Sequence, residues 1–464
     1  MVSKSGFYIL SACYLPLTIS SSSSSAVSSP DICAQDPLRI IFLGTPDVAA
    51  SSLRRLLDSC KGIPEANNNN NNNNNNSNIN DGIPIYEVVG VVSQPPAPVG
   101  RKQILTNSPV HDLTLQVNEK QQKNKDDSPP STDIPIFTPV KANEADFLES
   151  LRNLKPDLCI TAAYGNFLPT KFLNIPKLGT INIHPSLLPK YRGASPVQRC
   201  LENGDTVTGV SILYTVLKMD AGPIIFQSNR PLAGDEKASA LLPELFADGA
   251  KVLVDTILPQ LYEAKQKLYM KQKTALNDND IVWTDEQRFS LLSNLQEQDE
   301  NMVTHADKMT KDEGLCLFSE ETAETIHNKV RAFDIWPGTW GVFEIYEEID
   351  DDINSNSKSE GTNGHENGKR VKLITTRPIK KDSSPDSLFP MLGSYLEENN
   401  KIRSSPSSLF LLENKSNKKM KHLIAGCANN TYLELVEVQL EGKKPMQGKD
   451  WWNGLRGKQV RYSQ

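Results

Sequence analysis

The segment from Leu38 to Leu43 constrains the fold more than any other part of this chain. Its side chains are almost all large and apolar, and the run stops at Gly44-Thr45-Pro46. Such a run is typical of a strand buried on both faces of a parallel sheet, because a half-exposed strand would alternate apolar and polar residues. Asp47 to Leu57 then places apolar residues at helical spacing. The fold is therefore expected to begin with a strand and a helix of an α/β sheet.

The alternation of strands and helices continues through the first half of the chain. Further runs typical of buried strands are Tyr86–Val92, Asp157–Tyr164, Gly179–His184 and Thr208–Leu217, and helical spacing occurs at Asn143–Leu154 and Lys237–Leu261. This pattern predicts a Rossmann-like α/β domain with a mainly parallel sheet, whose ligands bind at the carboxyl ends of the strands. The asparagine run at 67–76 and the polar stretch at 113–133 are expected to be surface-loop insertions.

The second half of the chain predicts a separate, smaller domain. A helical pattern at Glu320–Phe333 precedes short strand-like runs at Thr339–Ile345, Val371–Thr375 and Tyr432–Leu440, with polar insertions between them. Helix followed by short strands favours a small β-barrel of the OB-like type. The expected organisation is a leader at 1–37, an α/β domain at 38–264, a linker at 265–304 and a carboxy-terminal domain at 305–464.

Charge and cysteine content exclude some classes of protein. Lys and Arg number 50 against 56 Asp and Glu, which argues against a wholly basic nucleic-acid binder but not against one basic face. The seven cysteines include no C-x-x-C pair, so we expect reduced thiols and no structural zinc. The apolar stretch from Phe7 to Ile19 is shorter than the roughly 20 residues of a membrane-spanning helix, and none is expected.

The first 30 residues are typical of a targeting leader. They contain one Lys, no Asp or Glu, and a serine run from Ser20 to Ser25. A serine-rich segment without acids fits an organellar transit peptide. We expect the mitochondrial matrix as the destination, with a plastid as the alternative because the leader has no Arg. A secretory signal or a plain tail also remains open.

Two polar residues stand out on one of the expected strands. Side chains alternate along a strand, so Ile181 and Ile183 share one face while Asn182 and His184 share the other. Pro185 cannot donate to the sheet and is expected to end the strand. Asn182 and His184 would then lie at a carboxyl end, where sites form. A hydrogen-bonded structural pair is the alternative.

A rigid loop and an acidic residue follow. Ser186–Ala194 contains two prolines and a glycine, which favour an irregular loop that walls a ligand or is merely structural. Asp220 lies in a tight turn with Ala221 and Gly222, again beyond an expected strand end, where it would act in a site or as a helix cap. No G-x-G-x-x-G follows the first strand, so we expect no NAD or other dinucleotide, and no His/Cys cluster suggests a metal.

Two long blocks resemble the folate-dependent formyltransferases. They are G-x-I-N-x-H-P-S-L-L-P-x-Y-R-G-A from Gly179 and G-V-S-I followed by M-D-A-G from Gly209. The resemblance covers residue 38 to about 261, apart from the insertions. It implies that the catalytic residues are Asn182, His184 and Asp220, and that the residues contacting the folate are Ser186, Leu187, Leu188 and Pro189.

The implied reaction is the attack of an amine on the formyl carbon of 10-formyltetrahydrofolate. Negative charge builds on the formyl oxygen, which Asn182 and a protonated His184 would stabilise. Asp220 would hold His184 charged and help to remove the ammonium proton.

The resemblance also bears on the amine. Members of this class formylate a purine precursor or a sugar nucleotide, or hydrolyse the formyl-folate. The F-x-G-T-P at Phe42–Pro46 resembles the start of the methionyl-tRNA formyltransferases. Gln94–Lys102 resembles their acceptor-stem loop, Q-P-D-R-P-A-G-R-G-K-K, although Pro96-Ala97 replaces its Asp-Arg pair. This implies that Arg101 and Lys102 bind tRNA.

The carboxy-terminal part resembles the same family. The similar segments are Lys308–Leu317, Ile326–Trp340 and Gln439–Arg456. From Asn414 onward the chain has ten Lys and Arg against four Asp and Glu. A basic strip with Trp451 and Trp452 would suit contact with the tRNA backbone, with Lys443 and Lys444 as candidates. The alternative is a solvated face with core tryptophans.

We therefore expect an organellar methionyl-tRNA formyltransferase that supports translation initiation. It would be a monomer that uses 10-formyltetrahydrofolate and initiator methionyl-tRNA, with no membrane association. A formyltransferase for a sugar nucleotide or other small amine is the first alternative. A catalytically silent folate- or tRNA-binding protein is the second, although the presence of Asn182, His184 and Asp220 argues against it.

Overall fold

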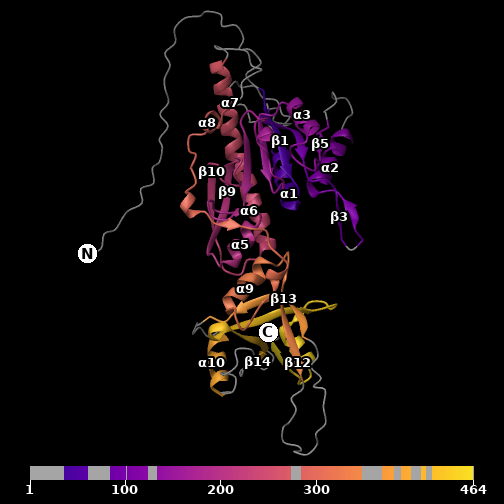
Figure 1. The fold of residues 1–464 in the computed structure, drawn as a ribbon, viewed down its shortest axis with the longest axis vertical. Coiled ribbons are helices and arrows are strands. Elements are labelled where there is room, and N and C mark those ends of the chain that lie inside the picture. The colour runs from indigo at the N-terminus through magenta and orange to yellow at the C-terminus, as the bar shows by residue number, and fades with distance from the viewer. Residues whose placement is uncertain are drawn as a thin grey trace, which may run out of the picture.

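The computed structural model describes residues 36–60, 84–100, 102–123, 133–272, 284–346, 368–380, 388–398, 409–413 and 421–462. These residues form an amino-terminal α/β domain and a carboxy-terminal domain built on an antiparallel sheet, which lies below it in Figure 1. Residues 1–35 of the expected leader, the asparagine run and residues 350–367 of the polar insertion expected at 350–369 lie outside the described residues.

The amino-terminal domain is organised around a mainly parallel sheet, in the order β10-β9-β7-β6-β1-β2-β5. Its strands are β1 Leu38–Gly44, β2 Tyr86–Val92, β5 Ile136–Phe137, β6 Leu158–Ala162, β7 Thr180–His184, β9 Val207–Tyr214 and β10 Ile224–Pro231. The strands from β7 to β5 are parallel, whereas β9 and β10 run antiparallel to their neighbours. The prediction of a Rossmann-like, mainly parallel sheet is confirmed.

The helices of this domain lie on both faces of the sheet. They are α1 Asp47–Asp58, α2 Pro109–Lys123, α3 Ala145–Asn153, α4 Thr170–Leu173, α5 Pro196–Glu202, α6 Ala238–Val252, a π-helical turn at Leu253–Ile257, α7 Leu258–Gln272 and α8 Asp285–Phe289. Two short pairings, β3 Ala97–Val99 with β4 Ile104–Thr106 and β8 Arg192–Gly193 with β11 His305–Ala306, lie outside the main sheet.

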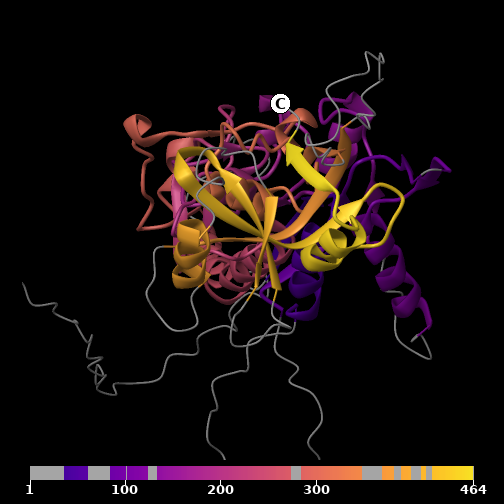
Figure 2. The same ribbon diagram turned by 90° about the horizontal axis from the view of Figure 1, so that it is seen from below.

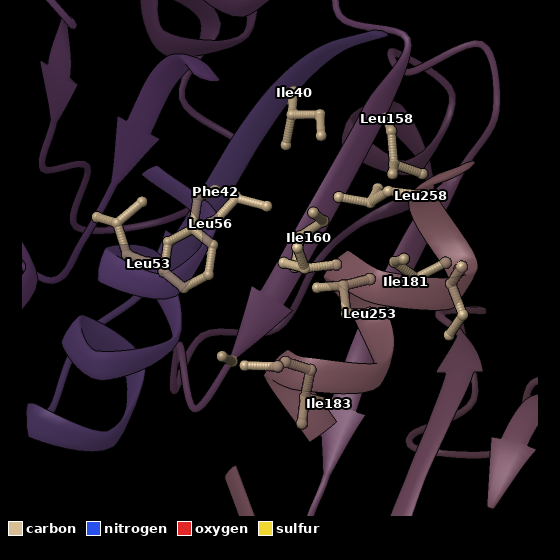
Figure 3. Close-up of a cluster of buried hydrophobic side chains, with 14 of the residues drawn as sticks. Ile40, Phe42, Leu53, Leu56, Leu158, Ile160, Ile181, Ile183, Leu253 and Leu258 are labelled. Carbon is tan, nitrogen blue, oxygen red and sulfur yellow. The ribbon is translucent and has the colours of Figure 1, made fainter. Parts of the chain in front are cut away.

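Strand β1 shows why both faces must be covered. Ile40 and Phe42 point into a cluster shared with α1, the π-helical turn and α7 (Figure 3). Ile41 and Leu43 point to the other face and pack with residues of α3 and α4. Burying each such side chain contributes roughly 1.5–3 kcal/mol. The prediction of a strand buried on both faces is confirmed.

The polar stretch at 113–133, expected to be a loop, is helical in its first part. Helix α2 extends to Lys123 and buries Val110 and Leu113 in the core that it shares with α1. The hydroxyl of Ser108 accepts a hydrogen bond from the His111 N–H at 3.1 Å and caps the start of the helix. The loop prediction was wrong there because a few buried residues and one cap are enough to hold a polar helix against the sheet.

The 265–304 segment, expected as a linker, packs on the amino-terminal domain. Helix α7 continues to Gln272. After it, the Arg288 side chain of α8 is buried and donates hydrogen bonds to the carbonyls of Pro176 and Lys177, each at 3.3 Å. Leu292 is also buried in the main core cluster, with Phe289, Leu291 and Leu295 packed against it, so the described part of this segment belongs to the folded domain.

The carboxy-terminal domain is a curled antiparallel sheet (Figure 2), half of a barrel and consistent with the predicted OB-like fold. Its elements are η4 Asp312–Gly314, α9 Ala323–Ala332, β12 Thr339–Tyr346, β13 Lys369–Pro378, α10 Leu388–Glu398, β14 Leu409–Glu413, β15 Lys421–Cys427, η6 Ala428–Asn430, β16 Thr431–Leu440, β17 Met446–Gln447, α11 Gly448–Gly454 and β18 Gln459–Tyr462, and the short helix η3 Glu300–Met302 precedes them on the amino-terminal domain. Trp451 is buried and meets the Phe343 ring edge-on, so it belongs to the core and not to an exposed strip.

The two domains meet where α9 packs on α5 and α6. His327 of α9 bridges them, with Nε2 3.1 Å from the Gly234 carbonyl and Nδ1 3.0 Å from the Thr376 hydroxyl. The Lys237 ammonium, just before α6, donates to the Ile374 carbonyl of β13 at 2.8 Å. Within the described ranges, none of the helices is both long and apolar enough to cross a membrane.

The buried His327 predicts a dependence of stability on pH. Burial lowers the pKa of His327 below its ordinary value, so the unfolded chain binds more protons than the folded one below about pH 6.5. The free energy of unfolding should fall as the pH drops through that range. In His327→Gln this part of the pH dependence should disappear. Urea unfolding at pH 5.5 and 7.5 measures it, and an unchanged pH dependence in the variant would contradict the prediction.

Candidate active site

Strand β7 presents two polar side chains at its carboxyl end. Ile181 and Ile183 point into the core cluster beside the π-helical turn and α7 (Figure 3), so Asn182 and His184 project from the opposite face of the sheet. His184 is the last residue of the strand. This is the arrangement that side-chain alternation predicted.

The ring of His184 has one nitrogen fixed and one nitrogen directed at a carboxylate. Nε2 lies 2.9 Å from the backbone carbonyl of Tyr191, and because a carbonyl only accepts hydrogen bonds, Nε2 must carry a hydrogen. Nδ1 lies 3.8 Å from Asp220 Oδ2, which is too long for a direct hydrogen bond. Nδ1 is therefore the reactive nitrogen, a proton acceptor in the neutral ring and a donor in the imidazolium.

Asp220 reaches this position through an unusual turn. Its Oδ2 accepts a hydrogen bond from the Gly193 N–H at 2.9 Å. Its backbone has a φ of 49°, a left-handed conformation that costs a residue with a Cβ about 1–2 kcal/mol. At Gly222 a Cβ would lie 1.9 Å from the Tyr214 carbonyl oxygen, so only glycine fits there. The turn is thus specified by close packing as well as by Asp220 itself.

The sequence analysis placed Asp220 in a tight turn beyond a strand end, and β9 does end before it, at Tyr214. Strand β9 runs antiparallel to β7, so its last residue, Tyr214, lies beside Ile181 and not beside His184. The connection at 215–223 turns back and carries Asp220 to the imidazole of His184.

Asn182 is oriented by a residue that the sequence analysis missed. Thr161 of β6 is its partner in the sheet register, and the Thr161 hydroxyl donates to Asn182 Oδ1 at 2.8 Å. This bond uses the amide oxygen, so the Nδ2 hydrogens are the donors that Asn182 can offer to a ligand. A polar residue inside the apolar run at 158–162 is the only signal in the sequence that pointed to Thr161.

The four residues expected to contact a folate form the loop after β7. The Ser186 hydroxyl donates to the Lys190 carbonyl at 2.8 Å. The Leu188 N–H donates to the Ser211 hydroxyl at 3.1 Å, and its carbonyl accepts from Gln227 at 2.7 Å. These hydrogen bonds of Ser186 and Leu188 join protein groups to one another and so stabilise the loop. The other two, Leu187 and Pro189, line a cavity of about 400 Å³ together with residues of the 296–302 segment. Folate contact at all four stays a prediction.

The residues expected to bind tRNA lie away from the catalytic group. Lys102 is exposed in the turn of the β3–β4 hairpin, which projects from the domain in Figure 1, and Arg101 lies outside the described residues. Lys443 and Lys444 are exposed in the turn after β16, in the other domain. The structure therefore places Lys102 on one surface and Lys443 and Lys444 on another. That these basic residues bind tRNA stays a prediction.

The described cysteines are held in their protonated form. Burial raises the pKa of the Cys60 and Cys200 thiols to about 11 and that of Cys316 to about 12, so these thiols stay protonated near neutral pH. In the part of the chain that the structure describes, no group of three His, Cys, Asp or Glu side chains could hold a metal ion.

Comparison with known proteins agrees with the grouping of an amide, an imidazole and a carboxylate on this fold. Residues 66–257 match the family described as "Formyl transferase", and residues 308–456 match "Formyl transferase, C-terminal domain". The two domains and their site thus define a formyl transferase.

Full-length relatives narrow the assignment. The methionyl-tRNA formyltransferase of Lactobacillus gasseri is 30% identical over 415 residues, which cover 89% of this chain and 95% of the relative. That of Thermotoga maritima is 35% identical over 301 residues, covering 65% and 74%. This chain belongs to the methionyl-tRNA formyltransferase family, and it is an enzyme.

A solved structure is similar at a greater distance. The N-formyltransferase of Helicobacter canadensis, in complex with folinic acid and dTDP-3-aminofucose, is 13% identical with a TM-score of 0.44 and covers 86% of this chain and 98% of its own. A likeness this weak carries no argument about this chain's substrate.

The orientation of Asn182 by Thr161 can be tested by removing one hydroxyl. Thr161→Val keeps the shape but loses the hydrogen bond to Asn182 Oδ1, so the amide can rotate away from the reacting oxygen. We expect kcat for formyl transfer to fall about tenfold, with KM little changed. Steady-state kinetics measures this, and Thr180→Val, a buried threonine of the neighbouring strand, is the control. Equal losses in both variants would contradict the specific role of Thr161.

Proposed function

We propose that this protein transfers the formyl group of 10-formyltetrahydrofolate to the α-amino group of methionyl-tRNA, with initiator tRNA as its substrate. The observation that carries the chemistry is the meeting of Asn182, His184 and Asp220 at one end of β7, with Nδ1 of His184 3.8 Å from Asp220 Oδ2. Membership of the methionyl-tRNA formyltransferase family supports the acceptor.

The geometry suits an addition–elimination reaction. The amine nitrogen bonds to the formyl carbon, and negative charge develops on the formyl oxygen. The Nδ2 hydrogens of Asn182 and an Nδ1–H of the His184 imidazolium are the donors for that oxyanion, and one such donor contributes about 2.7–4 kcal/mol. The bond from carbon to the folate nitrogen then breaks, and the proton lost by the amine ends on that nitrogen.

Asp220 supports both stages. Its carboxylate faces the imidazole and stabilises positive charge on the ring. The carboxylate is also the base that accepts the ammonium proton, through a water between the amine and Asp220. The bond from Nε2 to the Tyr191 carbonyl keeps the ring in place while Nδ1 reacts.

Exposed apolar side chains beside this site support a folate-type co-substrate. Phe167 is 62% exposed on the connection at 163–169, which follows β6, the neighbour of β7. Leu217 and Met219 are 55% and 65% exposed on the connection that carries Asp220. Uncovered apolar surface of this kind is typical of a place where a flat aromatic ligand binds.

Two surfaces support a tRNA acceptor. The β3–β4 hairpin projects from the amino-terminal domain with Lys102 in its turn (Figure 1), and Lys443 and Lys444 are exposed in the carboxy-terminal domain. Lysines spread over two domains suit a long anionic ligand better than a small amine.

The serine-rich leader sequence favours the mitochondrial matrix, with a plastid as the alternative. We propose that a monomer acts in translation initiation there.

The test is formyl transfer from 10-formyltetrahydrofolate to purified initiator methionyl-tRNA. Elongator methionyl-tRNA and a dTDP-linked aminosugar serve as competing acceptors. Rapid formylation of the initiator alone is expected. Transfer to the aminosugar with none to tRNA would keep the catalytic site and overturn the proposed acceptor.

Loss of the imidazole should abolish turnover. His184→Ala removes the donor and proton-transfer group at the end of β7, and we expect kcat to fall about 10²–10⁴-fold. Circular dichroism and the thermal unfolding midpoint report whether the fold is intact. His305→Ala, which changes an exposed histidine of the same chain, should keep the wild-type rate. A His184→Ala enzyme with near-normal kcat would contradict the mechanism.

The basic residues between β3 and β4 should affect the binding of tRNA and not the chemical step. Arg101→Ala and Lys102→Ala each remove a positive charge, so KM for methionyl-tRNA should rise and the slope of log affinity against log salt should fall by about one. The KM for 10-formyltetrahydrofolate should not change. Lys141→Ala, at an exposed lysine elsewhere in the domain, is the control. An unchanged KM for tRNA in both variants would show that the hairpin was misassigned.

A further inference from the structure

Gln298 is bonded to the catalytic turn, although it lies in the segment that the sequence predicts as a linker. Its Nε2 donates to the carbonyls of Asp220 and Gly222, each at 2.8 Å. Its Oε1 accepts a hydrogen bond from the Nε of Arg192 at 2.9 Å. Both polar atoms of the amide are therefore used on the residues around the carboxylate that faces His184.

The partner of the Gln298 amide oxygen is the buried cation of Arg192. The guanidinium of Arg192 is 3% exposed and also donates to Glu300 at 3.1 Å. The second carboxylate oxygen of Glu300 accepts from the Lys218 ammonium at 2.6 Å. Hydrogen bonds from Lys218 and Arg192 lower the pKa of the Glu300 carboxyl, which stays ionised near neutral pH. Residues 298 and 300 thus connect the loop at 192–193 with the turn at 218–222.

The backbone on both sides of Gln298 is itself anchored. Before it, the N–H and carbonyl of Gln296 pair with those of Ile224 at 2.9 and 2.8 Å. After it, Thr304 accepts the Tyr191 N–H on its hydroxyl at 2.8 Å and the Arg192 N–H on its carbonyl at 2.9 Å. The Gln298 amide is therefore presented by a backbone that is anchored on both sides.

The turn that receives these bonds needs them. Asp220 has a left-handed backbone, and its Oδ2 accepts a hydrogen bond from the N–H of Gly193, which directly follows Arg192. Gln298 Nε2 donates to the carbonyls of both Asp220 and Gly222, so one side chain holds the backbone on either side of Ala221. Without them the turn can relax, and the carboxylate moves relative to His184.

We propose that Gln298 is a positioning residue that sets the distance between the Asp220 carboxylate and Nδ1 of His184. This inference rests on the proposed function for the reaction that it serves. Gln298 acts through Asp220 and is not itself assigned a contact with a substrate. Misplacing a reacting group by about 1 Å lowers a rate about a hundredfold.

Two substitutions separate positioning from folding. Gln298→Met keeps the length of the side chain but removes its hydrogen bonds. Gln298→Glu keeps the acceptor for Arg192 but turns a carboxylate toward the two carbonyls. In both variants kcat should fall about ten- to a hundredfold, while KM for 10-formyltetrahydrofolate and for methionyl-tRNA changes less than about threefold. Asn294→Ser, at an exposed residue of the same segment outside the cavity lined by Leu187 and Pro189, should keep the wild-type kcat.

A second measurement does not depend on the identity of the acceptor. Hydrogen exchange of the Gly193 amide, which is protected by Asp220 Oδ2, should become faster in Gln298→Met than in wild type and in Asn294→Ser. Unchanged exchange at Gly193, or a wild-type kcat in Gln298→Met, would overturn the inference. Failure of the wild-type enzyme to formylate methionyl-tRNA would instead refute the proposed acceptor, and the exchange experiment would still decide the role of Gln298.

Discussion

The hydrogen bond between His184 Nε2 and the Tyr191 carbonyl determines how the rest of the site is built. It ties one ring nitrogen to the protein at 2.9 Å, so only Nδ1 can take part in chemistry. The loop at 186–191 must therefore turn back over the end of β7. Ser211 and Gln227, from the antiparallel strands β9 and β10, hold that loop through the backbone of Leu188. Two strands that break the parallel order thus support the catalytic end of a parallel sheet.

The same antiparallel strands explain the path of the chain to Asp220. Because β9 ends beside Ile181, the connection at 215–223 has to return to reach His184. The left-handed Asp220 and the close-packed Gly222 make this turn costly to form. Gln298 donates hydrogen bonds to its backbone from a segment that follows much later in the chain. The carboxylate therefore depends on a segment that the sequence predicts as a linker.

Predictions from the sequence succeeded where the information was local. The apolar run at 38–43 predicted a buried strand, and alternation along 179–184 predicted that Asn182 and His184 share a face, because both follow from neighbouring residues. The partnership of Asp220 with His184 came from the resemblance to a family, since no local pattern reveals which strands are antiparallel. Thr161 and Gln298 could not be predicted, because their roles depend on hydrogen bonds between segments far apart in the sequence.

The contact between the domains starts at the catalytic loop. Helix α5 begins at Pro196, three residues after Gly193, whose N–H holds Asp220, and its Val197 and Leu201 pack with Phe333 at the end of α9. The N–H of Ser195 donates to the Ala306 carbonyl at 3.0 Å, where the chain leaves for the carboxy-terminal domain. A buried apolar contact transmits displacement because it is close-packed. The domain proposed to bind tRNA is therefore joined, through one short helix, to the loop that fixes His184.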